Sequence, residues 1–123
     1  LLLVALSRRE QERARRRTGT PAPAPDEVEA LRRHAPAVRW IQAADNYLEL
    51  HAEGQVLTRR ITMRAAEAAL QPLGFVRVHR SVIVNRLHVD RIVPRSGGPE
   101  VQMVDGTALP TGRAFNANLR QLH

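Results

Sequence analysis

The stretch that decides the fold is Phe75-Val76-Arg77-Val78-His79-Arg80-Ser81-Val82-Ile83-Val84-Asn85. Successive side chains of a strand point to opposite faces, so the first two valines can enter a core while Arg77 and His79 face outward. The β-branched residues after Ser81 predict that the strand conformation continues to Asn85. A core does not require basic residues in the middle of its strand, so this pattern favours an anionic partner on the outer face.

Alternating apolar segments on either side of this stretch predict further short strands. Turn signals separate them at Asp45-Asn46, Glu53-Gly54, Ser96–Pro99 and Asp105-Gly106, and the last is the strongest hairpin signal. We expect strands over residues 38–43, 47–52, 55–61, 75–78, 91–95, 100–104 and 107–110, with 81–85 as a continuation. The chain is therefore predicted to be mainly β with short helices, without a parallel sheet.

Three segments carry helical signals. Thr62 is a candidate N-cap for an amphipathic helix that Pro72 and Gly74 end. Residues 26–34 form a second helix candidate with Asp26 as its N-cap, and residues 113–122 form a third. The predicted core consists of Trp40, Leu50, Met63, Leu70, Val76, Val78, Ile92 and Leu109.

Composition divides the chain into three parts. Residues 1–17 are predicted to be a helix that is either the end of an upstream soluble module or a juxtamembrane helix, because the apolar run 1–6 is too short to span a bilayer. Residues 18–37 combine a Pro-rich linker with the short helix, and residues 38–123 form the main domain. The expected location is the cytoplasm, with a tether to the inner face of the membrane if the upstream segment is transmembrane.

The charge of the chain favours an anionic partner. The net charge is +7, and all 19 basic residues are Arg. Arg suits bidentate contact with phosphate and guanine, although GC-rich codon usage also explains the bias. The window 75–95 concentrates the charge with five Arg against one acidic residue, Asp90. The alternative interpretation of this window is a solvated strand edge, whose charges deter aggregation.

Catalytic and metal-binding patterns are absent from the sequence. There is no Gly-rich phosphate loop, no His-Glu-x-x-His motif and no Cys, and the five His have no accompanying carboxylate pattern. Ser81 and His79 do not form a nucleophile–base pair. We therefore expect no enzyme activity, no metal and no cofactor.

Two polar features keep two interpretations each. The segment Thr111-Gly112-Arg113 follows a strand and either holds an anion with its backbone N–H groups or forms an ordinary turn. Asn85 either satisfies backbone groups or reaches a nucleic acid.

Three segments in order carry a resemblance to a known family. They are Trp40–His51, the signature Gly74–Ser81 with Ile83-Val84-Asn85, and Gly106–Pro110 before Arg113. Together they resemble the LytTR-type DNA-binding domain of bacterial transcription regulators over about residues 38–123. The resemblance implies an elongated β-β-β fold with short helices, and it implies a short helix at Ser81–Asn85, contrary to the strand propensity.

The resemblance also implies how the chain binds double-stranded DNA. Members of the family insert loops, rather than a recognition helix, into successive major grooves. Carried over to this sequence, the base contacts are Asn46, Arg80 and Arg113, and the phosphate contacts or supporting residues are Arg77, His79, Asn85 and Thr111. Two departures from the family pattern are Gly112, where Ser is common and where Thr111 could supply the hydroxyl, and the linker that replaces an extra first strand.

The partners implied by the family are tandem half-sites of double-stranded DNA, bound by a homodimer, and an upstream receiver domain or membrane module. The expected function is thus that of the output domain of a transcriptional regulator in a two-component system. An alternative from a different class is a basic protein-interaction module, which would bind an acidic partner through its charged face and its strand edges.

Overall fold

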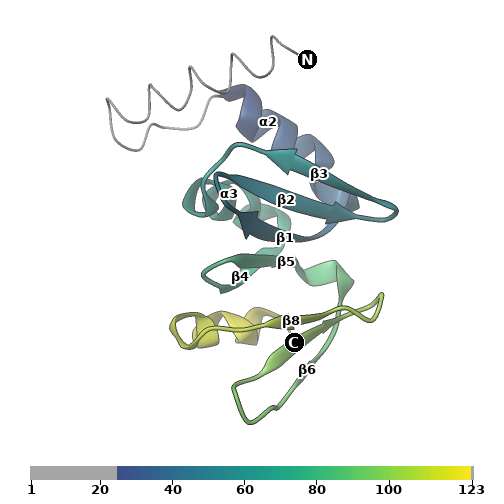
Figure 1. Ribbon diagram of the computed structural model, residues 1–123, viewed down its shortest axis with the longest axis vertical. Coiled ribbons are helices and arrows are strands. Elements are labelled where there is room, and N and C mark those ends of the chain that lie inside the picture. The colour runs from purple at the N-terminus through teal and green to yellow at the C-terminus, as the bar shows by residue number, and fades with distance from the viewer. Residues whose placement is uncertain (1–24, 123) are drawn as a thin grey trace.

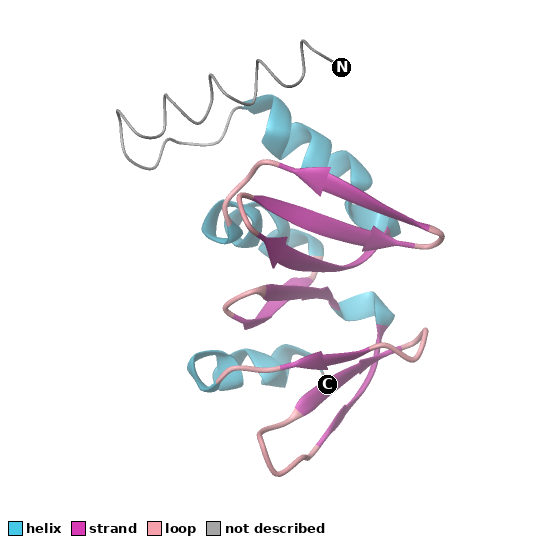
Figure 2. Ribbon diagram, in the orientation of Figure 1, coloured by secondary structure: helices cyan, strands magenta, loops and turns pink. Residues whose placement is uncertain are grey.

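The computed structural model describes residues 25–122, in eight strands and several short helices (Figures 1 and 2). The strands are β1 (Val38–Ala44), β2 (Tyr47–Ala52), β3 (Gln55–Arg59), β4 (Phe75–His79), β5 (Val82–Asn85), β6 (Val89–Val93), β7 (Glu100–Met103) and β8 (Ala108–Pro110). The α-helices are α2 (Pro25–His34) and α3 (Met63–Leu70), and the 3₁₀ helices are η1 (Ala35–Ala37), η2 (Gln71–Leu73), η3 (Arg86–His88) and η4 (Arg113–Leu122). The helix predicted at 1–17 and most of the linker lie outside the described residues.

Two antiparallel sheets follow one another along the long axis of the molecule (Figure 1). The larger sheet has the order β3-β2-β1-β5-β4, and the smaller has the order β6-β7-β8. Helices α2 and α3 accompany the larger sheet, whereas η4 lies beside the smaller one and β4. The prediction of an elongated, mainly β fold with short helices is confirmed.

The predicted signals of α3 act as expected, whereas Asp26 is not the N-cap of α2, because that helix already begins at Pro25 and Asp26 lies in its first turn. The Thr62 hydroxyl oxygen accepts the backbone N–H of Ala65 at 3.1 Å, which caps α3. Gly74 follows η2 with a φ of 92°, a left-handed conformation that lets the chain turn into β4. In α2, acidic residues occupy the first turn and basic residues the last, in agreement with the helix dipole.

Apolar side chains form two clusters, one on each face of the larger sheet. The first packs α2 and α3 against the sheet and includes Leu31, Leu50, Leu70 and Ile83. The second fills the space between β4, β5 and the smaller sheet, and its members are Val76, Val78, Val82, Val84, Val101, Met103, Leu109 and Leu119. Because the second cluster draws on both sheets, it holds them together.

Strand β5 corrects the short helix that the family resemblance implied for Ser81–Asn85. Residues Val82–Asn85 are a strand that pairs with both β1 and β4, and the short helix η3 comes only afterwards. All four strand residues are buried, with Ile83 in the first cluster and its two valine neighbours in the second. The strand conformation predicted from β propensity is therefore confirmed, since a strand covered on both faces needs an apolar run. It is not a continuation of β4, because the chain reverses at Arg80–Ser81 and β5 runs antiparallel to β4.

Other expectations need smaller corrections. Strand β3 ends at Arg59 rather than at residue 61, and β6 lies two residues earlier than predicted. Within the described part of the chain β1 is the first strand, and it lies between β2 and β5. Of the predicted core, Trp40, Met63 and Ile92 are only half-buried at the rim of the clusters, and the other members are buried. No helix within residues 25–122 is long and apolar enough to cross a membrane.

Candidate nucleic-acid interface

Three turns meet at one edge of the molecule, on the left of Figure 1. They are Asp45–Asn46 between β1 and β2, Arg80–Ser81 between β4 and β5, and Thr111–Arg113 after β8. Backbone hydrogen bonds hold two of them to neighbouring strands. The Ala43 N–H donates to the Ser81 carbonyl oxygen at 2.9 Å, and the Gly112 N–H donates to the Val78 carbonyl oxygen at 2.9 Å. We call these three turns the loop edge.

The turn at Arg80 is closed by its neighbours on both sides. The His79 ring nitrogen Nδ1 accepts the backbone N–H of Ser81 at 3.1 Å and lies 2.8 Å from the Ser81 hydroxyl oxygen. Because Nδ1 accepts the backbone N–H, the ring proton of the neutral imidazole resides on Nε2. The Arg80 residue is exposed at the tip of the turn. The turn thus exposes the Arg80 side chain on a backbone that the His79 ring holds in place through the Ser81 N–H.

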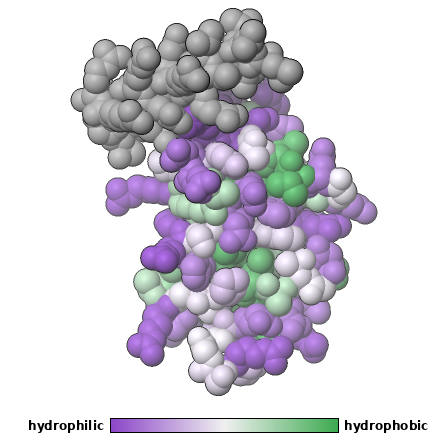
Figure 3. All heavy atoms as spheres, in the orientation of Figure 1, coloured by the Kyte–Doolittle hydropathy of each residue, from purple (hydrophilic) through white to green (hydrophobic). Residues whose placement is uncertain are grey.

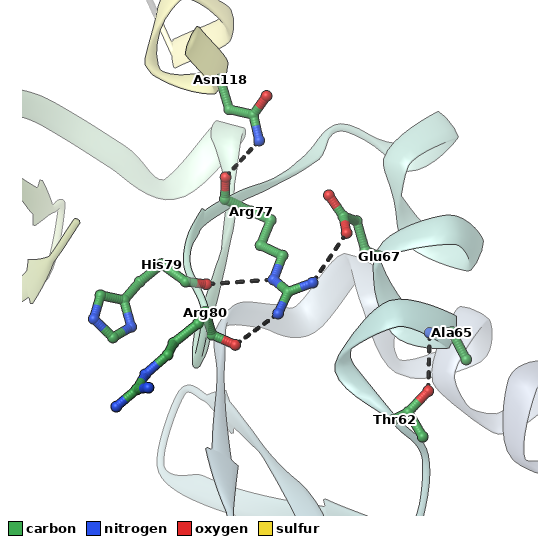
Figure 4. Close-up of polar contacts among 7 residues, drawn as sticks. All are labelled: Thr62, Ala65, Glu67, Arg77, His79, Arg80 and Asn118. Atoms are coloured by element: carbon green, nitrogen blue, oxygen red, sulfur yellow. Dashed lines mark hydrogen bonds and ion pairs between the residues drawn. The ribbon is translucent and has the colours of Figure 1, made fainter. Parts of the chain in front are cut away.

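Arg77 points back into the protein although it flanks this turn (Figure 4). Its guanidinium donates from Nε to the His79 carbonyl oxygen at 3.4 Å and from Nη2 to the Arg80 carbonyl oxygen at 2.7 Å. Nη1 lies 3.3 Å from the Glu67 carboxylate of α3, and the ring of Phe115 lies 4.9 Å from the guanidinium carbon. Only 17% of the Arg77 side chain is exposed.

Side-chain hydrogen bonds hold the loop that follows β8 on both sides of Arg113. The Thr111 hydroxyl donates to the Pro99 carbonyl oxygen, which ties the loop to the β6–β7 turn. Further on, the Asn118 amide donates to the Arg77 carbonyl oxygen at 2.8 Å and docks η4 on β4. Arg113 is exposed between these two anchors. Of the two interpretations of Thr111–Arg113, the ordinary turn is favoured over the anion site, because the Gly112 N–H already donates to the Val78 carbonyl oxygen.

Asn46 and Asn85 occupy contrasting environments. Asn46 is exposed in the β1–β2 turn, where Asp45 adopts a left-handed φ of 51°. Asn85 is only 2% exposed at the other end of β5 from the loop edge. Its side-chain Nδ2 donates to the Val38 carbonyl oxygen at 2.9 Å, and its side-chain Oδ1 accepts the Leu87 N–H at 3.1 Å. Its side chain therefore faces the interior and satisfies backbone groups.

Comparison with known proteins identifies the family. Residues 34–123 match the family of the LytTr DNA-binding domain. The chain belongs to the LytTR family. The expected resemblance is thus confirmed, and DNA binding in transcription regulation follows from membership of the family.

Two individual proteins resemble this LytTR domain. An uncharacterized response regulatory protein of Vibrio cholerae is 30% identical over 80 residues, which are 62% of this chain and 31% of that protein. The chain therefore spans about a third of the length of this relative. The solved LytTr DNA-binding domain of a methyl-accepting/DNA response regulator from Bacillus cereus is 27% identical, with a TM-score of 0.64, over 71% of this chain and 81% of that one.

The five Arg of the window 75–95, which the sequence analysis treated as one basic cluster, lie in different parts of the fold. Arg80 lies at the loop edge and Arg77 belongs to β4 with its side chain directed inward, whereas Arg86 lies in η3 at the far end of β5. On the smaller sheet, Arg91 donates to Gln102 and Arg95 pairs with Glu100. The LytTR domain thus directs only part of its basic residues to one edge. In the view of Figure 3 the surface is predominantly hydrophilic, with apolar residues in small patches.

Three residues around the loop edge were not predicted from the sequence: Glu67, Phe115 and Asn118. Each contacts Arg77 through side chain or backbone from another element, so the sequence carried no local signal for them. Within residues 25–122, no group of three or more His, Asp or Glu side chains is arranged to hold a metal ion. A LytTR domain belongs to a family of DNA-binding domains rather than to a class of enzymes.

Proposed function

We propose that this LytTR domain binds double-stranded DNA sequence-specifically by inserting the loop edge into successive major grooves. The base contacts are Asn46, Arg80 and Arg113. The observation that carries the proposal is that three exposed polar side chains sit on three turns at one edge of the molecule. Two of these turns are held to neighbouring strands by the Ala43–Ser81 and Gly112–Val78 hydrogen bonds.

The chemistry of these three side chains suits the edges of bases. An Arg guanidinium matches the O6 and N7 acceptors of guanine, and an Asn amide matches the donor and acceptor of adenine. Discrimination between bases requires the reading group to be held within about 0.5 Å of its working position. Turns at the ends of paired strands meet that requirement better than free loops do.

Neighbouring polar groups supply the contacts that carry no sequence information. In this proposal the half-buried His79 and Thr111 contact phosphates or order the turns beside the base-contacting residues, which we call the readers. Asn85 supports the fold through its buried side chain. The net charge of +7 provides the general attraction to DNA.

The proposal extends to the whole protein. By analogy with the response regulatory protein of Vibrio cholerae, the domain acts as the output module of a regulator whose upstream part is a receiver domain or a membrane module. The Pro-rich stretch of residues 18–25 then acts as the tether, since α2 packs against the larger sheet through Leu31. Two copies of the chain bind tandem half-sites as a homodimer on DNA.

Titration of labelled random duplex DNA at low and moderate salt tests the function. Binding at low salt that weakens steeply with added salt, followed by enrichment of one sequence from the random pool, is the expected result. Failure to bind at low salt would overturn DNA binding and favour an acidic protein partner. Salt-sensitive binding without any enrichment would refute only the sequence-specific part.

A further inference from the structure

We propose that Arg77 is a positioning residue, which fixes the Arg80 turn relative to the Arg113 loop and so sets the selectivity of DNA binding. This inference rests on the proposed function, because it takes Arg80 and Arg113 as the base readers. The sequence allowed two roles for Arg77, contact with a phosphate or support of the fold. The geometry points to the second.

Three of the five N–H donors of Arg77 are engaged within the chain. Each of its three guanidinium nitrogens donates to an oxygen, two of them backbone carbonyls of the turn and one the Glu67 carboxylate (Figure 4). The Phe115 ring lies close to the group, and little of the side chain is exposed. A phosphate would therefore have to compete with these three acceptors for the guanidinium.

Arg77 also connects the elements that carry the two Arg readers. Its side chain binds the carbonyl oxygens of His79 and Arg80, so it determines the path of the backbone that enters the turn. Its own carbonyl oxygen accepts the Asn118 amide, and its guanidinium lies close to the Phe115 ring, which follows Arg113 by two residues. Loosening Arg77 therefore changes the relative position of the Arg80 and Arg113 side chains.

Such a displacement affects the two kinds of DNA contact differently. A bidentate bond to a base edge depends on exact geometry, whereas attraction between a flexible cation and a phosphate tolerates movement. A positioning residue should thus alter specific binding and leave non-specific binding unchanged. A phosphate contact should alter both and change the salt dependence.

Substitution of Arg77 by Lys separates the two roles. Lysine keeps the positive charge and can still bind a phosphate, but its compact ammonium group cannot span two carbonyl oxygens and a carboxylate as the planar fork does. The 123-residue chain is titrated with a duplex that the wild type has selected from a random pool and with a scrambled duplex of equal length.

For Arg77→Lys we expect affinity for the selected duplex to fall about tenfold, while affinity for the scrambled duplex and the salt slope remain unchanged. Unchanged affinity for both duplexes would overturn the proposal, since a phosphate contact survives this substitution. Arg86→Lys is the matched control, because Arg86 is exposed at the far end of β5, and it should alter neither affinity.

Glu67→Gln provides a second test whose two outcomes have opposite signs. If Glu67 only repels DNA, removal of its charge strengthens binding to every duplex. If Glu67 orients Arg77, the preference for the selected duplex falls about threefold even though the chain has become more positive. A uniform rise in affinity for both duplexes would contradict the positioning role.

Amide hydrogen exchange without DNA distinguishes failure of this inference from failure of the proposed function. In Arg77→Lys the amides of Ser81 and Gly112 should exchange faster, while those of the β1–β2 pairing should not change. Unchanged exchange at both amides would overturn the positioning role whatever the DNA results. A wild type that selects no duplex would refute the base readers, and the exchange data would still decide whether Arg77 fixes the two loops. Glu67→Gln carries the same exchange test if Arg77→Lys does not fold.

Discussion

The Asp105 carboxylate accepts a hydrogen bond from the Arg39 guanidinium at 3.0 Å, and this ion pair joins the two sheets at a point outside their apolar contact. Arg39 belongs to β1, and Asp105 lies in the turn between β7 and β8. The second carboxylate oxygen accepts the Thr107 N–H at 2.9 Å. One side chain therefore both closes a turn of the smaller sheet and ties that sheet to the larger one.

The Asp105 pair predicts a loss of stability at acid pH. The backbone N–H of Thr107 lowers the pKa of the Asp105 carboxyl below its ordinary value of 3.8, and Arg39 lowers it further, against partial desolvation. Because the pKa is lower in the folded chain, this contribution is present above about pH 4 and is lost as the pH falls through the folded pKa. Asp105→Asn should reduce the free energy of unfolding at neutral pH by less than about 1 kcal/mol, since the turn is exposed.

Urea unfolding at a series of pH values measures this effect. The difference between wild type and Asp105→Asn should be constant at neutral pH and should disappear at strongly acid pH. Asp90→Asn is the control, as Asp90 is an exposed residue of β6. A difference that persists at strongly acid pH would show that the substitution acts through packing rather than through charge.

Arg80→Ala and Arg113→Ala should each weaken binding to a selected duplex by roughly 1–3 kcal/mol. Both side chains are exposed, so neither truncation should change the free energy of unfolding by more than about 0.5 kcal/mol. Fluorescence anisotropy with the selected duplex, and with duplexes altered at single base pairs, measures the loss and the relaxed discrimination. Unchanged specific affinity in both variants would show that other residues read the bases.

Asn85→Ala should destabilise the fold by about 2 kcal/mol, because it leaves the buried Val38 carbonyl oxygen and the Leu87 N–H without their partner. Asn46→Ala is the matched comparison, since Asn46 is exposed at the loop edge. It should leave thermal stability unchanged and lower only the affinity for a selected duplex. Thermal unfolding followed by circular dichroism checks both, and a stable Asn85→Ala that binds DNA poorly would reverse the roles given to the two residues.

The sequence predicted most strands and turns of this chain well because their signals are local, but it contained no signal for the turn at Arg80–Ser81. Alternation in residues 47–52 matches β2 residue for residue, and Thr62 caps α3 as its type and position indicate. The short helix expected at Ser81–Asn85, where the structure has a strand, came from the family resemblance. The β-branched residues of β5 predicted the strand conformation correctly, since such apolar residues favour a strand covered on both faces.

The loop edge was less predictable because it depends on contacts between distant segments. Asn46, Arg80 and Arg113 are exposed, but the sequence contains no sign of the hydrogen bonds that hold two of their turns to neighbouring strands. The inward course of Arg77 depends on Phe115, which follows it by 38 positions and is brought near by η4. Strand alternation alone assigned Arg77 to the surface, because alternation specifies a face of the sheet and not the partners found there.

Gly112→Ser should be tolerated and should strengthen binding to DNA, because Gly112 is not needed for its conformation. Its φ lies outside the left-handed region, and an added Cβ would meet the His79 and Phe115 rings at 3.6 Å, which is ordinary contact. A hydroxyl at this position lies beside the Arg113 reader, where it can donate to a phosphate. The substitution should leave the free energy of unfolding within about 0.5 kcal/mol of the wild type. Gly112→Ala is the control, since it adds the Cβ without the hydroxyl. Tighter binding in the Ser variant alone would assign the gain to the hydroxyl. Equal binding in the two variants would contradict a role of the hydroxyl. Weaker binding in both would mean that the approach of this loop to His79 leaves no room for a side chain at position 112.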